Sequence, residues 1–557
     1  MPDIQLELSQ PLVRSPDDPH TIRLGIVLNG TVSAGAWTAG VLDALFEALD
    51  LWEAEKAAGG KVPTHKVRLE VVGGASGGSV CAALLARAAT RSFPHVRDRS
   101  GAEGNPFWSL WVKTLRIEEM LEHAALDAGA SPDSLLSGMA IERAMDAILA
   151  WEGTPRPTRR AWLADPFHVL MTQTNLRGVP YGIEFRPGAD GSPRRSQFVA
   201  HADHVHFALP LSGNGGAGVR GDEFLVPPDF IGAQAAWKRL AVHARASGAF
   251  PFGFPPVRLD RPTHHYDWRA VLLPGGPGRE ERVALLKPAW PGDLPPVTYT
   301  YDAVDGGALN NSPFALVRSG LAGFGKGLDR DPETARATIV VVDPFVAQSP
   351  VAAPDQPLDL LGVAGGFIGS MVGHGRYSTA ELLLALDQEV ASRFLLTAGR
   401  DRAGGAKAWG EEALTTSGLG AFLGFLDPEF RVHDFLLGRR NALSWMTRHF
   451  MLPATNPVFG AFATGPDAAD YRVDGRLPII PVVPPLRALP AQPAWPAHGI
   501  ARDQLKLRVR QRLRAVVKAL AGDFPCDGLV AGFVGDWGAG RFMEKVQEAL
   551  TDLDRRA

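Results

Sequence analysis

The sequence contains little cysteine, little net charge and no long apolar run. Its two cysteines, Cys81 and Cys526, are too few for a disulfide framework or a four-cysteine zinc site. Lys and Arg number 57 against 60 Asp and Glu, so the net charge is −3 and the basic excess of a nucleic-acid-binding protein is missing. The longest weakly interrupted apolar run, residues 360–372, is 13 residues long, whereas a helix that spans a bilayer needs about 20.

Residues 1–20 carry Asp and Glu and lack the basic and then apolar pattern of a secretion signal. Together with the low cysteine content, this pattern predicts a cytoplasmic protein with reduced thiols. The charge balance predicts that nucleic acid is not a partner. The sequence gives no indication of the oligomeric state.

Glycine and proline are abundant, with 61 and 45 residues, and together they make up about a fifth of the 557 residues. They follow no Gly-X-Y period, which excludes collagen, and 45% hydrophobic residues are enough for a sizeable core. The length predicts two to four domains. The excess glycine and proline must therefore occupy turns, loops and places where two backbone segments approach closely.

Strand-like and helical segments alternate in the first half of the chain. This alternation predicts an α/β fold with a mainly parallel sheet that is covered by helices on both faces. One helix is expected at residues 36–49. A second is expected to follow the Gly-Gly-Ala-Ser-Gly-Gly segment at residues 73–78 and to run through residue 89. The apolar, β-branched segments that predict buried strands are residues 23–28, 67–72, 167–174 and 338–342.

Two proline-rich stretches divide the chain. Residues 345–357 indicate a boundary after the sheet, and residues 477–496, with seven prolines, read as an extended connector. The patterns between and after them are mostly helical, as in residues 379–397 and 503–520. The predicted parts are an N-terminal arm (1–20), an α/β domain (21–345) and a mostly helical C-terminal region (346–557) that contains the connector (477–496).

Two apolar segments of the C-terminal region could contact lipid. Residues 503–520 carry six Lys or Arg against one Asp, and their apolar side chains form one helical stripe. Such a helix can lie on an anionic membrane, but packing on the core with a solvated basic face is the favoured interpretation. Residues 360–372 have two interpretations, a lipid-facing lid and a buried glycine-rich helix, of which the second is favoured.

Ser76 is the candidate nucleophile. It lies in Gly74-Ala75-Ser76-Gly77-Gly78, which matches G-x-S-x-G between a predicted strand and a predicted helix. A sharp turn at that position lifts a serine hydroxyl off the end of the strand, and small neighbours relieve the crowding. The alternative is a plain glycine-rich turn or a phosphate-binding one.

Asp305 is the candidate acid, in the only Asp-Gly-Gly of the chain. Standing alone, this triplet favours a tight turn. A carboxylate held against a serine hydroxyl can, however, orient the hydroxyl and accept its proton, which gives a nucleophile–base pair without histidine.

A second strand-to-helix loop, residues 28–35, can present backbone N–H groups at a helix N-terminus, where they stabilise a developing oxyanion. It contains no G-x-G-x-x-G, which disfavours a dinucleotide site.

Four blocks, in order along the chain, resemble the patatin-like phospholipase family. They are LNGTVSAGAWTAGVL (28–42), GASGGS (74–79), ARASGAFPFGFPPV (244–257) and VDGGALNNSPF (304–314). The resemblance covers roughly residues 20–345, about three-fifths of the chain. The remainder is similar to the long C-terminal part of patatin-related bacterial proteins, especially residues 425–439.

This resemblance implies a three-layer α/β/α fold and a Ser–Asp dyad, with Ser76 as nucleophile and Asp305 as its base. It also implies an oxyanion hole at Gly30, Thr31 and Val32. The family normally has three glycines there and a basic residue two positions later, whereas this chain keeps only Gly30 and has Ala34 at the basic position. Backbone N–H groups can still supply the hole, with a modest activity expected because each lost donor costs about 100- to 1,000-fold in rate.

The implied function is lipid acyl hydrolysis of the phospholipase A type through an acyl-enzyme, with no cofactor and no metal. The implied partners are a lipid or acyl-ester substrate and, transiently, a membrane surface. Two alternatives stay open: a carboxylesterase or thioesterase with a small acyl pocket, and a weakly active scaffold whose C-terminal part binds a partner.

Two histidine-based constellations compete with this interpretation. A Ser–His–Asp triad would need one of the later histidines, which are His374, His433, His449 and His498. A metal site could use His204 and His206, which share a face if residues 201–206 form a strand, together with His264 and His265. A polar edge strand is the favoured interpretation of the second pattern.

Overall fold

The structure is a computed structural model of the 557-residue chain. The predictions for residues 360–372 (apart from residue 366), for residues 379–390 and for Cys526 fall outside the described residues. The described residues are 2–13, 18–156, 158–185, 194–212, 219–229, 232–273, 275–278, 280–292, 296–346, 366, 391–521 and 527–557.

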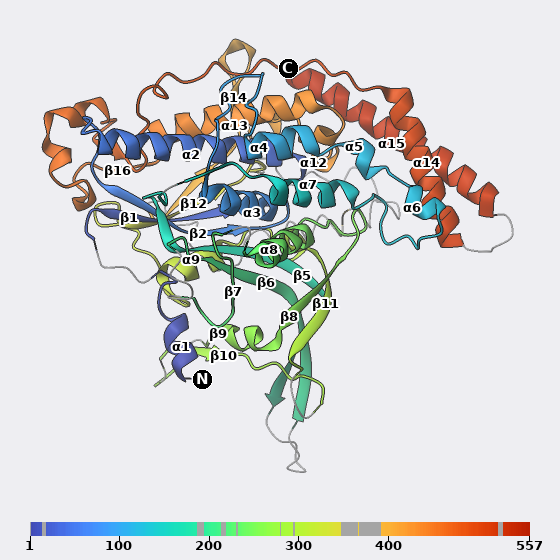
Figure 1. The fold of residues 1–557 in the computed structure, drawn as a ribbon, viewed down its shortest axis with the longest axis horizontal. Coiled ribbons are helices and arrows are strands. Elements are labelled where there is room, and N and C mark those ends of the chain that lie inside the picture. The colour runs from blue at the N-terminus through green and yellow to red at the C-terminus, as the bar shows by residue number, and fades with distance from the viewer. Residues whose placement is uncertain are drawn as a thin grey trace.

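The protein is of mixed α/β class and is built around a large, mainly parallel sheet with helices on both faces (Figure 1). The main path of strands is β13-β12-β1-β2-β5-β11-β8, and β6 and β7 extend it beside β5. From β13 to β5 neighbouring strands pair in parallel, whereas β6 and β11 pair with β5 in the antiparallel sense. The strands are β1 (Thr21–Leu28), β2 (Lys66–Gly74), β5 (Leu163–Phe185), β6 (Arg194–Leu209), β7 (Glu223–Leu225), β8 (Val257–Pro262), β11 (Thr298–Asp305), β12 (Ala337–Val342) and β13 (Arg393–Leu396).

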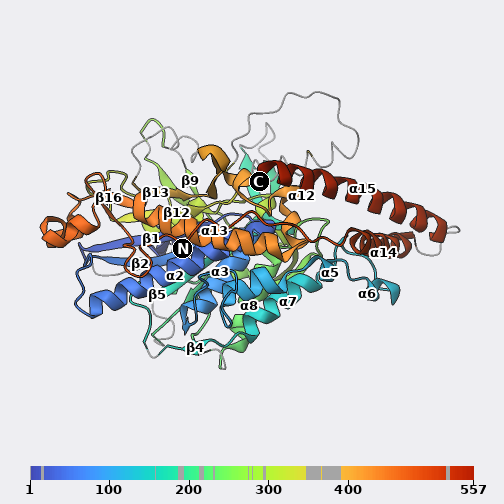
Figure 2. The same cartoon turned by 90° about the horizontal axis from the view of Figure 1, so that it is seen from above.

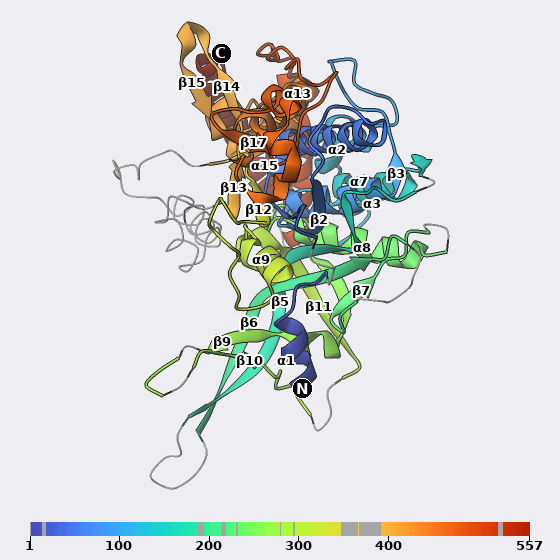
Figure 3. The ribbon, with the colours of Figure 1, turned by 90° about the vertical axis from the view of Figure 1, so that its left-hand side faces the viewer.

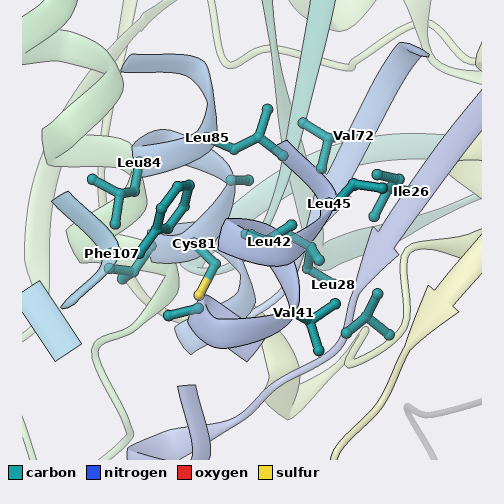
Figure 4. Packing of buried hydrophobic residues seen from close by; sticks show 14 of the residues in the cluster. Ile26, Leu28, Val41, Leu42, Leu45, Val72, Cys81, Leu84, Leu85 and Phe107 are labelled. Carbon is teal, nitrogen blue, oxygen red and sulfur yellow. The ribbon is translucent and has the colours of Figure 1, made fainter. Parts of the chain in front are cut away.

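The inner strands are apolar on both faces because each face packs against helices, the arrangement expected of parallel strands. On one face Val27 and Ile339 pack against α9 (Phe314–Ala322). On the other face the apolar side chains meet α2 (Gly35–Ala57) and α3 (Gly77–Ala89), and Figure 4 shows this packing around Cys81. Burial raises the pKa of the Cys81 thiol, so this cysteine is a core residue and no nucleophile.

Shorter elements surround the sheet, and β5 with β6 extends from it as a long ribbon (Figure 3). The other helices are α1 (Pro2–Leu8), α4 (Pro106–Trp108), α5 (Ile117–Met120), α6 (Ala124–Asp127), α7 (Met139–Ala150), α8 (Gln234–Ser247), α12 (Gly418–Ala421), α13 (Pro428–Arg448), α14 (Arg502–Ala521) and α15 (Asp527–Arg556). The other strands are β3 (Arg91–Ser92), β4 (Thr154–Pro155), β9 (Ala270–Leu273), β10 (Arg282–Leu285), β14 (Gly399–Asp401), β15 (Lys407–Trp409), β16 (Met451–Pro453) and β17 (Arg476–Pro478).

The C-terminal region packs directly on the sheet-bearing part. Helix α13 lies along α2, as seen from above in Figure 2. Two glycines allow the close approach: a Cβ on Gly40 would overlap the carbonyl oxygen of Phe435, and one on Gly438 would overlap that of Trp37. The division at residue 345 stays a prediction, and the central sheet continues past it because β13 pairs with β12.

The helix predicted for residues 379–397 is wrong in its described last part. Arg393–Leu396 is instead the strand β13, in parallel register with Ile339 to Val342 of β12. The reason is tertiary: an unpaired edge of the sheet offers backbone partners that outweigh a local helical pattern. The connector predicted for residues 477–496 has no helix, and after β17 it runs in bends, turns and irregular backbone.

Helix α14 covers the predicted helix 503–520 and forms a hairpin with α15 at the right-hand end of Figure 1. Its apolar stripe is mostly covered, because Leu505, Val509 and Val516 are buried, while Leu520 is exposed. The packed helix of the favoured interpretation agrees with this burial. Its basic face is solvated only in part, because Arg512 is buried and donates to three backbone carbonyls of residues 122–135. In the part of the chain that the structure describes, no helix is long and apolar enough to cross a membrane.

Candidate active site

Ser76 stands in a tight turn between β2 and α3. Its φ of 53° and ψ of −129° belong to a strained region for a residue with a side chain. A strained strand-to-helix turn of this kind presents a nucleophile at the end of a sheet. The glycine two positions later is needed for space, because a Cβ on Gly78 would overlap the carbonyl oxygens of Leu28 and Asn29.

The Ser76 hydroxyl donates a hydrogen bond to Asp305, with 2.6 Å between Oγ and Oδ2. Asp305 is the last residue of β11, and the two residues, 229 positions apart, meet at the same end of the sheet. Ser76 is 9% exposed and Asp305 4% exposed. This is the direct contact that the Ser–Asp hypothesis requires, since no other side chain stands between the hydroxyl and its proton acceptor.

The environment of Asp305 favours a proton acceptor that works near neutral pH. Burial raises the pKa of Asp305 to about 7, and the bonds from the Ser76 hydroxyl and the Gly307 N–H lower it only in part. Gly307 N lies 2.7 Å from Asp305 Oδ1, which leaves Oδ2 for the serine. A general base is most effective when its pKa is near the working pH.

The block at residues 244–257 connects the two residues of the pair. The Ser247 hydroxyl, at the end of α8, accepts the Ser76 N–H at 3.1 Å and lies 2.7 Å from the Ser79 hydroxyl. Two residues further, the Ala249 carbonyl accepts the Asp305 N–H at 2.8 Å. Sequence reasoning gave Ser247 no role, because a serine among small residues carries no signal of its long-range partner.

Replacing Ser247 with alanine should leave the buried Ser76 N–H without its acceptor. We expect a loss of about 1–3 kcal/mol in the free energy of unfolding. We also expect kcat for ester hydrolysis to fall by about 10- to 100-fold, because small displacements of a nucleophile are costly. Urea unfolding and steady-state kinetics measure the two effects. Ser319→Ala is the control, because among the described residues that hydroxyl bonds only the Ala315 carbonyl of its own helix. Equal effects of both changes would contradict the prediction.

The loop predicted to hold the oxyanion lies against Ser76. A Cβ on Gly30 would be 3.3 Å from Ser76 Cβ, and Val32 lines the same cavity as Ser76. Within the described residues, the N–H groups of Gly30 and Thr31 donate no hydrogen bond. Val32 adopts a φ of 47°, a strained value that is typical of functional loops. The loop therefore has backbone donors to offer although two of the family's glycines are replaced.

Asn311 is a second residue that sequence reasoning left without a role. Its side chain oxygen lies so close to Gly30 and Gly307 that a Cβ on either glycine would collide with it. The side chain is 7% exposed. Asn311 therefore packs between the predicted oxyanion loop and the turn that carries Asp305.

An apolar cavity of about 60 Å³ opens beside Ser76 and Asp305. Its walls come from segments far apart in the sequence, including two phenylalanines of the C-terminal region. Trp111, in the π-helical turn Ser109–Thr114, lies against Gly77 next to the nucleophile. The side chains that form the walls are Val32, Val80, Trp111, Leu115, Met120, Ile141, Ala144, Met145, Phe250, Phe254, Phe422 and Phe425.

The histidines of the competing triad lie elsewhere or outside the described residues. His433 contacts Asp434, with 2.7 Å between Nδ1 and Oδ1, and His374 is not among the described residues. The hydrogen-bond acceptor of the Ser76 hydroxyl is the Asp305 carboxylate itself, so the place that a triad assigns to imidazole is occupied.

The histidine cluster of β6 is surrounded by arginines. The rings of His204 and His206 share a face, with centroids 5.1 Å apart. Arg269 donates to His204, and Arg220 donates to His206 Nδ1 at 2.8 Å. Burial, and then these cations, hold the pKa values of both histidines well below the usual value. The same cations would repel a metal ion, and no metal-binding group of three or more side chains occurs among the described residues.

Comparison with known proteins adds a relative but no activity. No protein-family model matches the chain. The chain is similar to the uncharacterized protein y4iI of Sinorhizobium fredii, with 30% identity over 470 residues, a match that includes 78% of this chain. The matched segment spans 65% of that relative's length. The chemistry of the site must therefore carry any functional conclusion.

Proposed function

We propose that this protein is a serine acyl hydrolase with a patatin-like α/β/α architecture that cleaves ester-linked acyl groups. The observation that carries the proposal is the 2.6 Å contact between a strained, buried serine hydroxyl and a single buried carboxylate. The four sequence blocks that resemble patatin-like phospholipases support it, and they alone suggest lipid acyl groups as substrates.

In the proposed mechanism Asp305 accepts the Ser76 proton while Oγ attacks the ester carbonyl carbon. Backbone N–H groups of the loop Gly30, Thr31 and Val32 stabilise the oxyanion of the tetrahedral intermediate. The intermediate collapses to an acyl-enzyme when protonated Asp305 gives its proton to the leaving alcohol. Asp305 then activates a water molecule, which hydrolyses the acyl-enzyme and restores Ser76. These groups complete the cycle without a cofactor.

A carboxylesterase with a small acyl pocket is the second candidate, and the cavity volume of about 60 Å³ favours it. Small-molecule sites usually measure about 300–1,000 Å³. A panel of short-chain esters and long-chain phospholipid vesicles separates the two enzymes. Contact with a membrane surface stays a prediction.

A fluorophosphonate probe tests the proposal as a whole. We expect the full-length protein to become covalently labelled and to lose ester hydrolysis in parallel. Absence of both labelling and hydrolysis in folded protein would reject the enzyme and favour the weakly active scaffold.

The pH dependence of kcat/KM should report the ionisation of Asp305. Only the carboxylate accepts a proton, so activity should rise with an apparent pKa of about 7 and fall about tenfold per pH unit below it. Rates for an uncharged ester between pH 5 and 9 give the profile. Repeating it at two temperatures distinguishes carboxyl from imidazole, because carboxyl ionisation has a very small enthalpy. A profile that is flat across this range, or a strongly temperature-dependent pKa, would contradict the assignment.

A further inference from the structure

The C-terminal region supplies one wall of the cavity beside Ser76. Phe422 and Phe425 follow α12, more than 100 residues after Asp305, and both line the cavity. Phe425 is buried, whereas Phe422 is half-buried. The cavity beside the nucleophile is therefore completed by a part of the chain that the four resembling blocks do not include.

Aromatic contacts join this wall to the block at residues 244–257. The Phe422 ring lies 6.2 Å from that of Phe250 and stacks on that of Phe254 at 6.5 Å. It also lies 5.7 Å from the Phe425 ring. Phe422 therefore bridges the segment that positions Ser76 and the C-terminal region.

Hydrogen bonds hold the wall segment, residues 415–425, in place. Asp434 of α13 accepts the N–H groups of Thr415 and Thr416, each at 3.0 Å, and also both threonine hydroxyls. Arg556, in the last turn of α15, donates to the Ser417 hydroxyl at 2.9 Å. Leu423 packs with Val546, Leu550 and Leu553 of α15. A segment with this many attachments forms a fixed wall.

The wall segment also contacts the oxyanion loop. The Ser33 hydroxyl, directly after Val32, donates to the Ala421 carbonyl. Val32, Leu419 and Ala421 all have positive φ, at 47°, 57° and 68°. Residues other than glycine keep a positive φ only where the surrounding structure stabilises it. Here the hydrogen bond from Ser33 to Ala421 joins the two strained segments.

We propose that residues 415–425 are part of the active site and that Phe422 and Phe425 restrict the substrate to esters of short acyl chains. This inference rests on the proposed acyl hydrolase. A cavity of about 60 Å³ is small beside the roughly 300–1,000 Å³ that is usual for small-molecule sites, so it suits a short acyl chain better than a long one. A longer chain collides with Phe422, whatever the alcohol part of the ester.

Hydrolysis of p-nitrophenyl acetate, butyrate, octanoate and laurate by the full-length protein tests the inference. The parent should prefer butyrate to octanoate. Phe422→Ala and Phe425→Ala should each raise the octanoate-to-butyrate ratio of kcat/KM by about tenfold or more, because each added methylene in a fitting pocket is worth about that factor. Phe422→Leu, which keeps an apolar side chain in the wall, should shift the ratio in the same direction by less.

Phe462→Ala is the matched control, because Phe462 is also a half-buried phenylalanine of the C-terminal region but packs on Tyr471. It should leave the ratio unchanged. A parent that hydrolyses octanoate as fast as butyrate overturns this inference alone. So do variants that are labelled by fluorophosphonate at the parental rate and keep the parental ratio. A folded parent without labelling or hydrolysis overturns the proposed function and the inference with it.

Discussion

Asp305→Asn should lower kcat for ester hydrolysis by about 10⁴-fold while the protein stays folded. Asparagine has the size of aspartate. Its Oδ1 can keep the bond from the Gly307 N–H and its NH2 can donate to Ser76 Oγ, but it cannot take up the serine proton. Loss of the acidic member of a comparable serine site costs about this factor. The neutral amide also suits the buried position, where Asp305 has its pKa raised to about 7 and is half protonated at neutral pH. Stability should therefore change little.

Ser76→Ala should remove fluorophosphonate labelling completely, whereas Asp305→Asn should only slow it. The serine oxygen forms the bond to the probe, and the carboxylate only assists. The double variant should be no slower than Ser76→Ala, because residues that act as one unit show non-additive losses. Labelling time courses and single-turnover kinetics distinguish the two roles.

Asp302→Asn is the matched control for this experiment. Asp302 lies on the same strand, three residues before Asp305, and it pairs with Arg258 at the surface at 3.7 Å. Its replacement should leave kcat within about a factor of two, because exposed ion pairs contribute at most about 1 kcal/mol. Full activity of Asp305→Asn, or an equal loss in both variants, would remove Asp305 from the mechanism.

Arg439→Met should destabilise the protein by about 3–5 kcal/mol, the largest stability effect that we expect from one substitution. Arg439 of α13 is buried and forms ion pairs with Asp43 and Glu47 of α2, which are also buried. Burial raises the pKa of Asp43, but the charges of Arg439 and His95 outweigh this effect and hold the pKa below its usual value. Without Arg439, α2 keeps two carboxylates in the core with too few cations.

Urea unfolding with intrinsic tryptophan fluorescence measures this effect. Arg448→Met is the matched control, because it makes the same substitution at the exposed end of the same helix. Its free energy of unfolding should stay within about 0.5 kcal/mol of that of the parent. The urea midpoint of Arg439→Met should also rise when the pH is lowered toward 5, because protonation neutralises the carboxyl groups of Asp43 and Glu47 that have lost their partner. Equal stability of the two variants would show that α2 and α13 do not depend on the buried ion pairs.

The strands and the nucleophile turn were readable from the sequence because their signals are local. Buried parallel strands are runs of β-branched residues, as in Thr338 to Val342, and the turn at Ser76 needs small residues on both sides. The helix expected at residues 379–397 shows the limit of such signals. Its last residues form β13, because the open edge of β12 lies far away in the sequence.

What the sequence determined by itself was the set of candidate groups: a serine in a sharp turn, an acid in a unique Asp-Gly-Gly, and glycines where backbone segments approach closely. The tertiary structure decided which groups meet. It placed Asp305 Oδ2 at 2.6 Å from Ser76 Oγ, made Ser247 the acceptor of the Ser76 N–H, and made Phe422 part of the cavity wall. Burial and long-range contacts depend on how the whole chain packs, so neither the raised pKa of Asp305 nor the C-terminal wall has a local pattern in the sequence.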